Sequence, residues 1–269
     1  VDGHLNQESW VRELSGIHIT RSTDRGYTWE PERKIITPIS RPTTAGRIIE
    51  LEDGTILLPM EGSNHESEAL GAWVLCSKDH GDSWTVRGVV ADNKNPDLPG
   101  KEHMGEEDGS ISSTDTAFGS TWKGSDVGFH ETRLLKMSSG RILIGMRTRG
   151  DNFYTAYSDD EATTWSKPER TPIFCNGSSP FDLLLLDDKR ILATYGHRQP
   201  PWGIRACISN DEGKTWDIRN EFILRDDGLD RDIGYPSSQQ LEDGRILTVY
   251  YWHNEDQIRH LLSLKWELE

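Results

Sequence analysis

The sequence predicts an all-β protein, a β-propeller built from four-stranded antiparallel blades. Three observations lead to this prediction. An octapeptide of the form S-x-D-x-G-x-[ST]-W occurs four times, an apolar hairpin pattern also occurs four times, and the chain contains 25 Gly and 10 Trp, most of them beside turn signals. Short strands joined by reverse turns account for this combination, whereas long amphipathic helices do not.

Each octapeptide follows an alternating or apolar stretch, so we expect it to be the turn that closes a strand pair. The Ser and Asp side chains can bond the amides of the turn, Gly permits a positive φ, and Trp covers the hairpin against its neighbour. One copy has Ala162 in the glycine slot, which costs stability if that position needs a positive φ. The four copies are Ser22–Trp29, Ser77–Trp84, Ser158–Trp165 and Ser209–Trp216.

The second repeat is an apolar strand, a tight turn and another apolar strand. Asp-Gly between alternating strands, as at Asp53-Gly54, is a strong hairpin signal. The turn precedes the next octapeptide by 18 to 23 residues, so hairpin and octapeptide together make a module of about four strands, the size of a propeller blade. The four turns are centred near Gly54, Gly140, Lys189 and Gly244.

A single propeller domain over residues 1–269 is expected, because all-β chains often use about 250 to 300 residues as one domain. The first module contains an octapeptide without its hairpin, so we expect roughly one further blade upstream of Val1. A polar insertion as long as residues 95–124 is usually functional or mobile. The modules span approximately residues 1–38 (partial), 39–94, 125–170, 171–222 and 223–269.

Composition and charge exclude several classes of partner. With 30 Lys and Arg against 45 Asp and Glu, the formal charge of −15 argues against a phosphate-tracking surface, so no nucleic acid is expected. The longest apolar run, Ala72–Cys76, is too short to span a membrane. Cys76, Cys175 and Cys207 fit buried thiols, and no histidine pair has ligand spacing, so neither a metal nor another cofactor is expected.

The octapeptides are similar to the Asp-box, or BNR, repeats of the sialidase superfamily, and the resemblance extends over nearly all of the chain. It implies a six-bladed propeller with its active site at the central axis, on inner strands and the loops that follow them. Asp boxes lie on the rim of such propellers and also occur in non-catalytic proteins. They therefore indicate the fold more strongly than the chemistry. The compartment cannot be read from the sequence.

Three further segments resemble the parts of sialidases that carry functional residues. Glu131 opens one module and Arg147 closes the second strand of the same module, as a Glu and an Arg do in sialidases. Arg205 stands four residues before an octapeptide, like another sialidase arginine, and Arg198 in the preceding loop is the alternative. Tyr235, in a Gly-Tyr-Pro-Ser context near the last hairpin, resembles the tyrosine nucleophile of the family.

This set suits a sugar that carries a carboxylate on its anomeric carbon. Such a substrate repels an Asp or Glu nucleophile but not the neutral hydroxyl of Tyr235. Arg147 and Arg205 or Arg198 offer planar, bidentate partners for the carboxylate. Glu131 can take the phenol proton, which matters because an unperturbed tyrosine pKa is about 10. The resemblance therefore implies an exo-glycosidase that hydrolyses sialosides, or related carboxylated sugars, with retention.

The sequence also departs from the family pattern. Sialidases have an additional arginine in an Arg-Ile-Pro context; the nearest match here, Arg41-Pro42, stands on a different module. Asp2, twenty residues before the first octapeptide, is the candidate acid/base, although Glu8 or Glu13 could equally be loop carboxylates. These departures leave two alternatives open: a propeller glycosidase of different sugar specificity, and a non-catalytic propeller that binds an acidic carbohydrate.

The candidate residues have plainer interpretations as well. Tyr235 could be an aromatic residue at a strand start, and Glu131 could simply form an ion pair with Arg133 or Arg147. The polar stretch Glu61–Glu68 follows a second hairpin strand and could line the mouth of the site, but we expect a solvated loop there.

Overall fold

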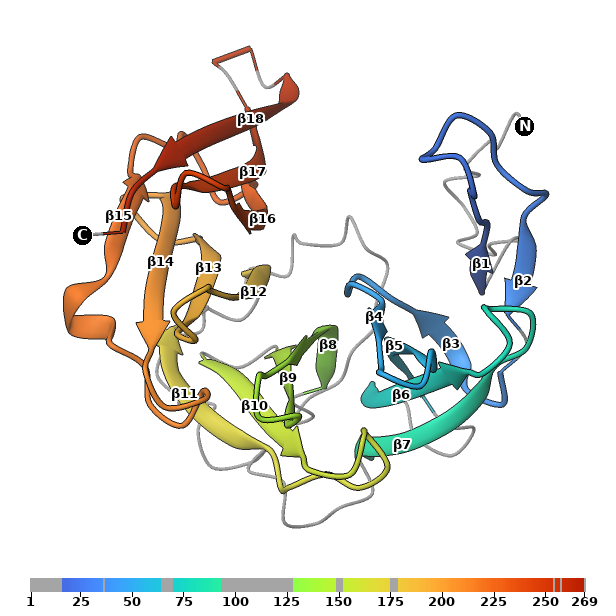
Figure 1. The fold of residues 1–269 in the computed structure, drawn as a ribbon. Coiled ribbons are helices and arrows are strands. Elements are labelled where there is room, and N and C mark those ends of the chain that lie inside the picture. Colours follow the sequence, from blue (N-terminus) through green and yellow to red (C-terminus); the bar gives the residue numbers. More distant parts are fainter. Residues whose placement is uncertain are drawn as a thin grey trace.

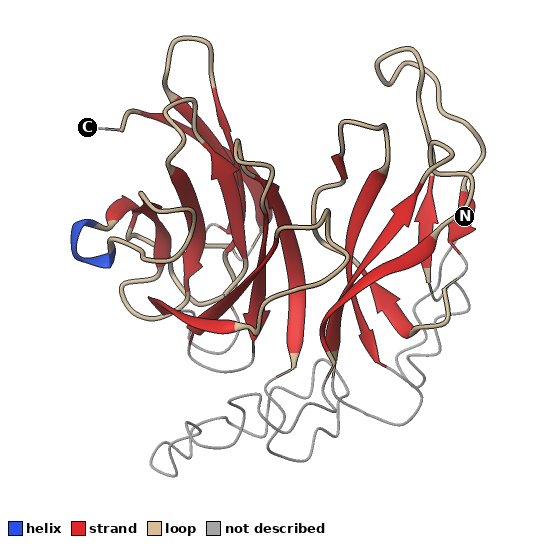
Figure 2. Ribbon diagram, turned by 60° about the horizontal axis from the view of Figure 1, so that its bottom comes forward, coloured by secondary structure: helices blue, strands red, loops and turns tan. Residues whose placement is uncertain are grey.

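The computed structural model describes residues 16–35, 37–63, 70–92, 128–148, 152–174, 179–253, 255–256 and 258–268. These residues form β-strands and loops, apart from one turn of 3-10 helix, η2 (Ile218–Asn220), visible in Figure 2. The predicted all-β class is therefore confirmed. Within these ranges, no helix has the length and apolar character needed to cross a bilayer.

The described strands form five antiparallel sheets that follow one another along the chain. The first sheet consists of β1 (Ile17–Ile19) and β2 (Arg33–Ile35). The second consists of β3 (Ser40–Thr43), β4 (Ile49–Glu50), β5 (Ile56–Ser63), β6 (Gly71–Ser77) and β7 (Thr85–Ala91). The third consists of β8 (Phe129–Lys136), β9 (Ile142–Thr148), β10 (Asn152–Ser158) and β11 (Glu169–Phe174). The fourth consists of β12 (Phe181–Leu185), β13 (Ile191–His197), β14 (Gly203–Ser209) and β15 (Phe222–Arg225). The fifth consists of β16 (Gly234–Gln240), β17 (Ile246–His253) and β18 (Arg259–Trp266).

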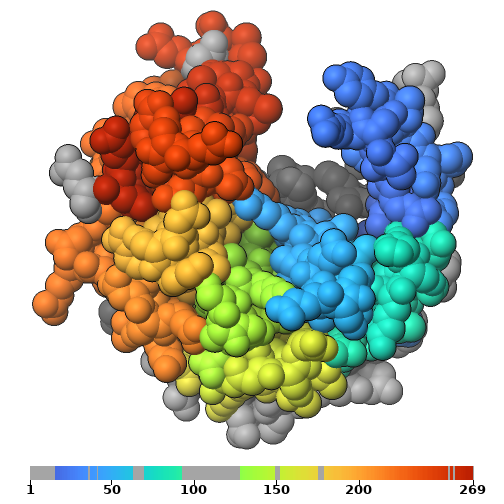
Figure 3. All heavy atoms as spheres, in the orientation of Figure 1, coloured from blue at the N-terminus to red at the C-terminus, as the bar shows by residue number. Residues whose placement is uncertain are grey.

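The sheets stand side by side in an arc, with β4, β8, β12 and β16 nearest its centre (Figure 1). The third and fourth sheets have the four strands that the sequence predicts, whereas β3 and β4 both pair with β5 in the second sheet and the fifth has three strands. In Figure 3 the first and fifth sheets lie on either side of an open gap. The described sheets thus form no closed ring, and the number of six blades stays a prediction.

The hydrophobic core is divided into layers between neighbouring sheets. Strands β6 and β14 are buried along their whole length because a sheet covers each of their faces, while β18 alternates between exposed and half-buried residues. Representative core residues are Ile17, Leu58 and Trp73 between the first two sheets, Val74 and Ile144 in the next layer, Leu143, Phe153 and Tyr195 in the third, and Ile204, Ile246 and Trp252 in the last.

The predicted hairpin turns are confirmed. Each central residue has a positive φ, namely 82° at Gly54, 90° at Gly140, 74° at Lys189 and 83° at Gly244. The last three turns join the first two strands of their sheets, and the turn at Gly54 joins β4 and β5. The outer strands β11 and β15 run across the expected module boundaries at residues 170 and 222. Each of them pairs with the strand before its octapeptide, so it belongs to the preceding sheet.

The octapeptides form the predicted turns, and all four have the same hydrogen bonds around their Ser and Asp side chains. In the first three copies the Trp indole also donates to the backbone of the turn, whereas the buried indole nitrogen of Trp216 has no hydrogen-bond partner among the described residues. In the second copy, Ser77 Oγ donates to Asp79 Oδ1 at 2.7 Å, and the other carboxylate oxygen accepts from Ser83 Oγ at 2.6 Å. The amide of Gly81 donates to Ser77 Oγ at 2.7 Å. The fourth and fifth positions of every copy have positive φ, including 68° at Ala162, so the strain anticipated there exists.

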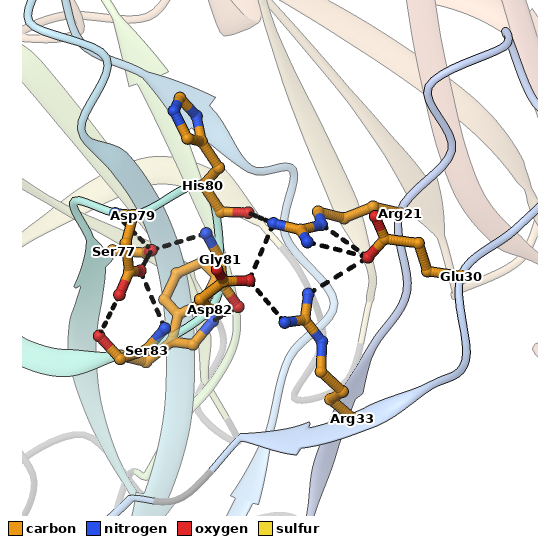
Figure 4. A network of polar contacts seen from close by, with 10 residues as sticks. Arg21, Glu30, Arg33, Ser77, Asp79, His80, Gly81, Asp82 and Ser83 are labelled. Carbon is orange, nitrogen blue, oxygen red and sulfur yellow. Dashed lines mark hydrogen bonds and ion pairs between the residues drawn. The ribbon is translucent and has the colours of Figure 1, made fainter.

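The same turns connect neighbouring sheets at the rim. Arg21 of the first sheet donates to the carbonyl oxygen of His80 at 2.6 Å and lies 3.0 Å from Asp82, which also pairs with Arg33 at 2.5 Å (Figure 4). The following sheets repeat this arrangement, with Arg87 bonded to the carbonyl oxygen of Glu161. Each octapeptide therefore closes its own strand pair, and the second and third copies also provide carbonyl acceptors for an arginine from the sheet before them.

Candidate active site

Antiparallel pairing places the start of one strand beside the end of its partner strand. In the third sheet His130 on β8 pairs with Arg147 on β9, and in the fifth Gly234 on β16 pairs with Tyr251 on β17. The inner strands of these sheets lie around the centre of the arc (Figure 1). Residues at these strand ends are therefore brought together although they are far apart in the sequence.

Three of the predicted residues meet at this point. The hydroxyl of Tyr235 donates a hydrogen bond to Oε1 of Glu131. Arg147 Nη1 lies 2.5 Å from Glu131 Oε2 and donates to the Tyr235 hydroxyl at 3.3 Å. The contact joins the third and fifth sheets, with the fourth between them. Tyr235 is 41% exposed and so can be reached from solvent, whereas the Arg147 side chain is only 16% exposed.

Both partners of this hydrogen bond have an unusual backbone conformation. The φ angle is +47° at Glu131 and +48° at Tyr235, in the left-handed region that residues other than Gly seldom adopt. The pairing register shifts at the same places, between His130 and Arg133 on β8 and between Gly234 and Ser237 on β16. Such bulges redirect a side chain away from its regular position on the strand.

The electrostatics of the cluster follow from burial and from the pairing. Burial and the neighbouring Glu131 raise the pKa of the Tyr235 phenol, so Tyr235 is neutral at rest. Burial alone would lower the pKa of Arg147, but Glu131 and Tyr235 outweigh it and the pKa is raised. The cluster therefore holds a neutral phenol next to a carboxylate and a guanidinium that stays charged.

A second arginine lies close to this cluster. Arg198 follows β13 and donates from Nε to the carbonyl oxygen of Ile233 at 3.0 Å and from Nη2 to the Tyr251 hydroxyl at 3.0 Å. Burial and the charge of Arg147 lower its pKa. The ring of Tyr251 lies 5.9 Å from that of Tyr235, and its hydroxyl donates to Asp232 at 2.6 Å.

The structure does not bring Arg205 to this cluster. Arg205 lies in the middle of β14 and is buried, and its described ion pair is with Glu221 at 3.9 Å. A mid-strand position on the third strand faces the neighbouring sheet, whereas Arg147 and Arg198 both stand at or just after the end of a second strand. That shared position is the sequence signal that favours Arg198. Asp2, the candidate acid/base, lies outside the described residues.

The expectation of a solvated loop from Glu61 onward is wrong for Glu61 itself. Glu61 belongs to β5 and is 8% exposed. One carboxylate oxygen accepts a hydrogen bond from Thr43 Oγ1 at 2.7 Å, and the other accepts one from the backbone amide of Glu131. Burial, opposed by these two hydrogen bonds, raises the pKa of Glu61 to about 7.

A second polar group connects the inner strands close to this site. Asp182 on β12 is buried and accepts hydrogen bonds from Arg47 at 2.8 Å and from the amide of Ser238 at 2.9 Å. Arg133 Nε lies 3.8 Å from the same carboxylate, and Arg47 also donates to Ser237 Oγ. We call these residues the Asp182 hub. It joins four of the five sheets.

Comparison with known proteins identifies the family to which the chain belongs. Residues 4–248 match the family of BNR repeat-like domains, and the chain belongs to that family. A sialidase of Bacteroides fragilis (strain YCH46) is 21% identical over 283 residues, which cover 96% of this chain and 44% of the sialidase. The chain thus spans less than half the length of that relative.

Solved structures show the same sialidase-like fold. A protein of unknown function from Dyadobacter fermentans has a TM-score of 0.72 and 25% identity, over 95% of this chain and 65% of that protein. The intramolecular trans-sialidase of Ruminococcus gnavus has a TM-score of 0.60 and 17% identity, over 93% and 50%. An α-L-arabinofuranosidase of Fusarium graminearum has a TM-score of 0.54 and 14% identity, over 82% and 61%. At these last two identities the similarity concerns the fold alone.

Proposed function

We propose that this chain carries the tyrosine-containing part of the active site of a sialidase-type exo-glycosidase, on a six-bladed propeller. One observation carries the proposal: the hydrogen bond from Tyr235 to Glu131, with Arg147 touching both. These residues come from two sheets that are not neighbours, and each of the bonded pair sits at a bulge with a positive φ. Backbone strain of this kind is concentrated at functional sites.

In the proposed reaction, Tyr235 attacks the anomeric carbon while its phenolic proton passes to Glu131. The bond to the leaving group breaks, and an acid, for which Asp2 is the candidate, protonates the departing oxygen. Water then attacks the tyrosyl–sugar bond and gives its proton to the same acid/base, while Glu131 returns the phenolic proton to Tyr235. Each of the two displacements inverts the anomeric carbon, so the configuration is retained. The raised pKa of Tyr235 makes this transfer necessary, because the phenol does not ionise by itself near neutral pH.

Arg147 and Arg198 are the proposed partners of the substrate carboxylate. Both are largely buried and both remain protonated at any useful pH. Arg147 donates a hydrogen bond to the proposed nucleophile, Tyr235. Arg198 donates one to Tyr251, whose ring lies beside that of Tyr235. Arg205 is left out because its guanidinium pairs with Glu221 instead.

A glycosidase for a sugar without a carboxylate is the second candidate. Arg147 is already paired with Glu131 at 2.5 Å, and Glu61 adds a second carboxylate next to Glu131. Both features reduce the positive potential that an anionic sugar needs. The fold that the chain shares with an arabinofuranosidase is compatible with this second candidate.

The test is hydrolysis of a fluorogenic sialoside, with Tyr235→Phe as the decisive variant. We expect this change to lower kcat by about three orders of magnitude, because the nucleophile is lost. Tyr157→Phe is the matched control, since Tyr157 is also 41% exposed but lies on β10. Activity that survives Tyr235→Phe would exclude Tyr235 as the nucleophile, and cleavage of an arabinofuranoside in place of the sialoside would favour the second candidate.

A further inference from the structure

The buried carboxylate of Glu61 lies behind Glu131 and is not used in the reaction above. It comes from the neighbouring sheet, at the end of β5, and is 8% exposed. Its two oxygens are both engaged, one by the Thr43 hydroxyl and the other by the backbone amide of Glu131. Because both oxygens point to protein donors, Glu61 is suited to hold its neighbours and not to contact a substrate.

The amide of Glu131 needs such an acceptor. At the bulge in β8 the pairing with β9 passes from His130 directly to Arg133, so Glu131 has no cross-strand partner in that register. A buried amide without an acceptor costs about 1 to 3 kcal/mol. The carboxylate of Glu61 satisfies this amide while φ is +47°. In a regular strand the amide and the side chain of Glu131 would both point elsewhere.

We propose that Glu61 is a positioning residue for the nucleophile pair. By accepting the amide of Glu131, it fixes the left-handed backbone that directs the Glu131 carboxylate to the hydroxyl of Tyr235 and to Arg147. This inference rests on the proposed function, because Glu131 is a catalytic group only if Tyr235 attacks the sugar. Glu61 itself makes no contact with the reacting atoms.

The charge of Glu61 is set by the groups that face it. These are the hydroxyl of Thr43 from β3, the apolar Ala72 opposite it on β6, the amide and carboxylate of Glu131 from β8, and the guanidinium of Arg147 from β9. An ionised acceptor holds an amide more strongly than a neutral one. The pKa of Glu61 is raised to about 7, so the hydrogen bond that it accepts from the Glu131 amide should weaken as the pH falls through neutrality and the carboxylate is protonated.

Kinetics of two variants give the first test. Glu61→Ala removes the acceptor and should lower kcat on the fluorogenic sialoside about 10- to 100-fold with KM nearly unchanged, because the base is displaced while the arginines stay. Glu61→Gln keeps a neutral acceptor, so it should lose less activity and should lack the wild-type change of kcat near pH 7. Glu52→Gln, at a side chain that is 96% exposed, is the control and should behave as wild type. An unchanged kcat in Glu61→Ala would overturn the proposal.

Hydrogen exchange of the peptide around residue 131 separates this proposal from the proposed function. The exchange of the Glu131 amide should accelerate at least about tenfold in Glu61→Ala and remain slow in Glu61→Gln, whether or not the sialoside is cleaved. Slow exchange in wild type without any hydrolysis would refute the sialidase activity but not the contact. Unaltered exchange in Glu61→Ala, or faster exchange in all core peptides alike, would overturn the positioning role.

Discussion

At the scale of single residues, the site depends on two left-handed positions that the sequence does not favour. Neither Glu131 nor Tyr235 is glycine, and a non-glycine residue held in this region costs about 1 to 3 kcal/mol. The surrounding contacts must therefore hold both backbones in place. For Glu131 the structure shows these contacts: its backbone amide donates a hydrogen bond to the Glu61 carboxylate, and its own carboxylate forms an ion pair with Arg147. Geometry at Glu131 is thus fixed by groups on both sides of its Cα atom.

Burial of Glu61 predicts a pH-dependent stability. Its pKa is about 7 in the folded protein and about 4.5 in the unfolded chain, so the folded state binds more protons between these values. The carboxyl group therefore costs stability above pH 7, and this cost disappears as the pH falls toward 4.5. Relative to Glu61→Gln, wild type should gain up to about 3 kcal/mol in the free energy of unfolding between pH 8 and pH 5, measured by urea denaturation. A difference between the two proteins that does not change with pH would contradict the raised pKa.

The candidate site could be predicted only where its residues are tied to recognisable strand ends. Glu131, Arg147 and Tyr235 flank hairpins whose turns are visible in the sequence, and the structure brings these three together. The sequence offers one signal for choosing between Arg198 and Arg205: Arg198 follows the end of a second strand, as Arg147 does within its own sheet, whereas Arg205 lies in the middle of a third strand. The contact of Glu61 with Glu131 is not predictable from the sequence, because the two residues are 70 positions apart and belong to different sheets.

At the scale of elements, the fold is predictable because its turn chemistry is local. The Ser and Asp of each octapeptide bond donors within the same eight residues, and these bonds lower the pKa of Asp24 and Asp160 to about 2. Nothing distant is required for this geometry, so the repeat can be read as a turn directly. The number of strands in a sheet is less predictable, since β3 and β4 share one partner.

Substitution of two glycines that have similar φ angles distinguishes the cost of backbone strain from the cost of steric crowding. Gly140 has φ +90° and open space where a Cβ atom would lie, whereas Gly213 has φ +85° and Leu143 Cδ2 at 2.9 Å from that position. Gly140→Ala should lower the free energy of unfolding by about 1 kcal/mol, from strain alone. Gly213→Ala should cost at least about 1 kcal/mol more, because Leu143 is buried and must move. Equal losses in thermal or urea unfolding would mean that Leu143 adjusts freely.

At the scale of the whole molecule, apolar layers lie between neighbouring sheets, and the Asp182 hub adds a buried polar connection among the inner strands. The Asp182 hub buries a carboxylate among the inner strands and connects the second, third, fourth and fifth sheets. The described sheets form an arc (Figure 3). The hub is close to the candidate site, because Arg47 bonds Ser237, two residues beyond Tyr235.

Removing the carboxylate of the hub should therefore destabilise the protein more than removing a comparable one at the rim. Asp182→Ala leaves the buried guanidinium of Arg133 without its carboxylate and should lower the free energy of unfolding by about 3 kcal/mol or more. Asp159→Ala is the control: Asp159 pairs with Arg141 at a similar distance, 2.7 Å against 2.8 Å for Arg47 and Asp182, but it is exposed, and its loss should change little. Adding Arg133→Met to Asp182→Ala should restore part of the stability, since no buried charge is then left unpaired. If the double variant is no more stable than Asp182→Ala in urea denaturation, the cost comes from lost packing and not from the unpaired charge.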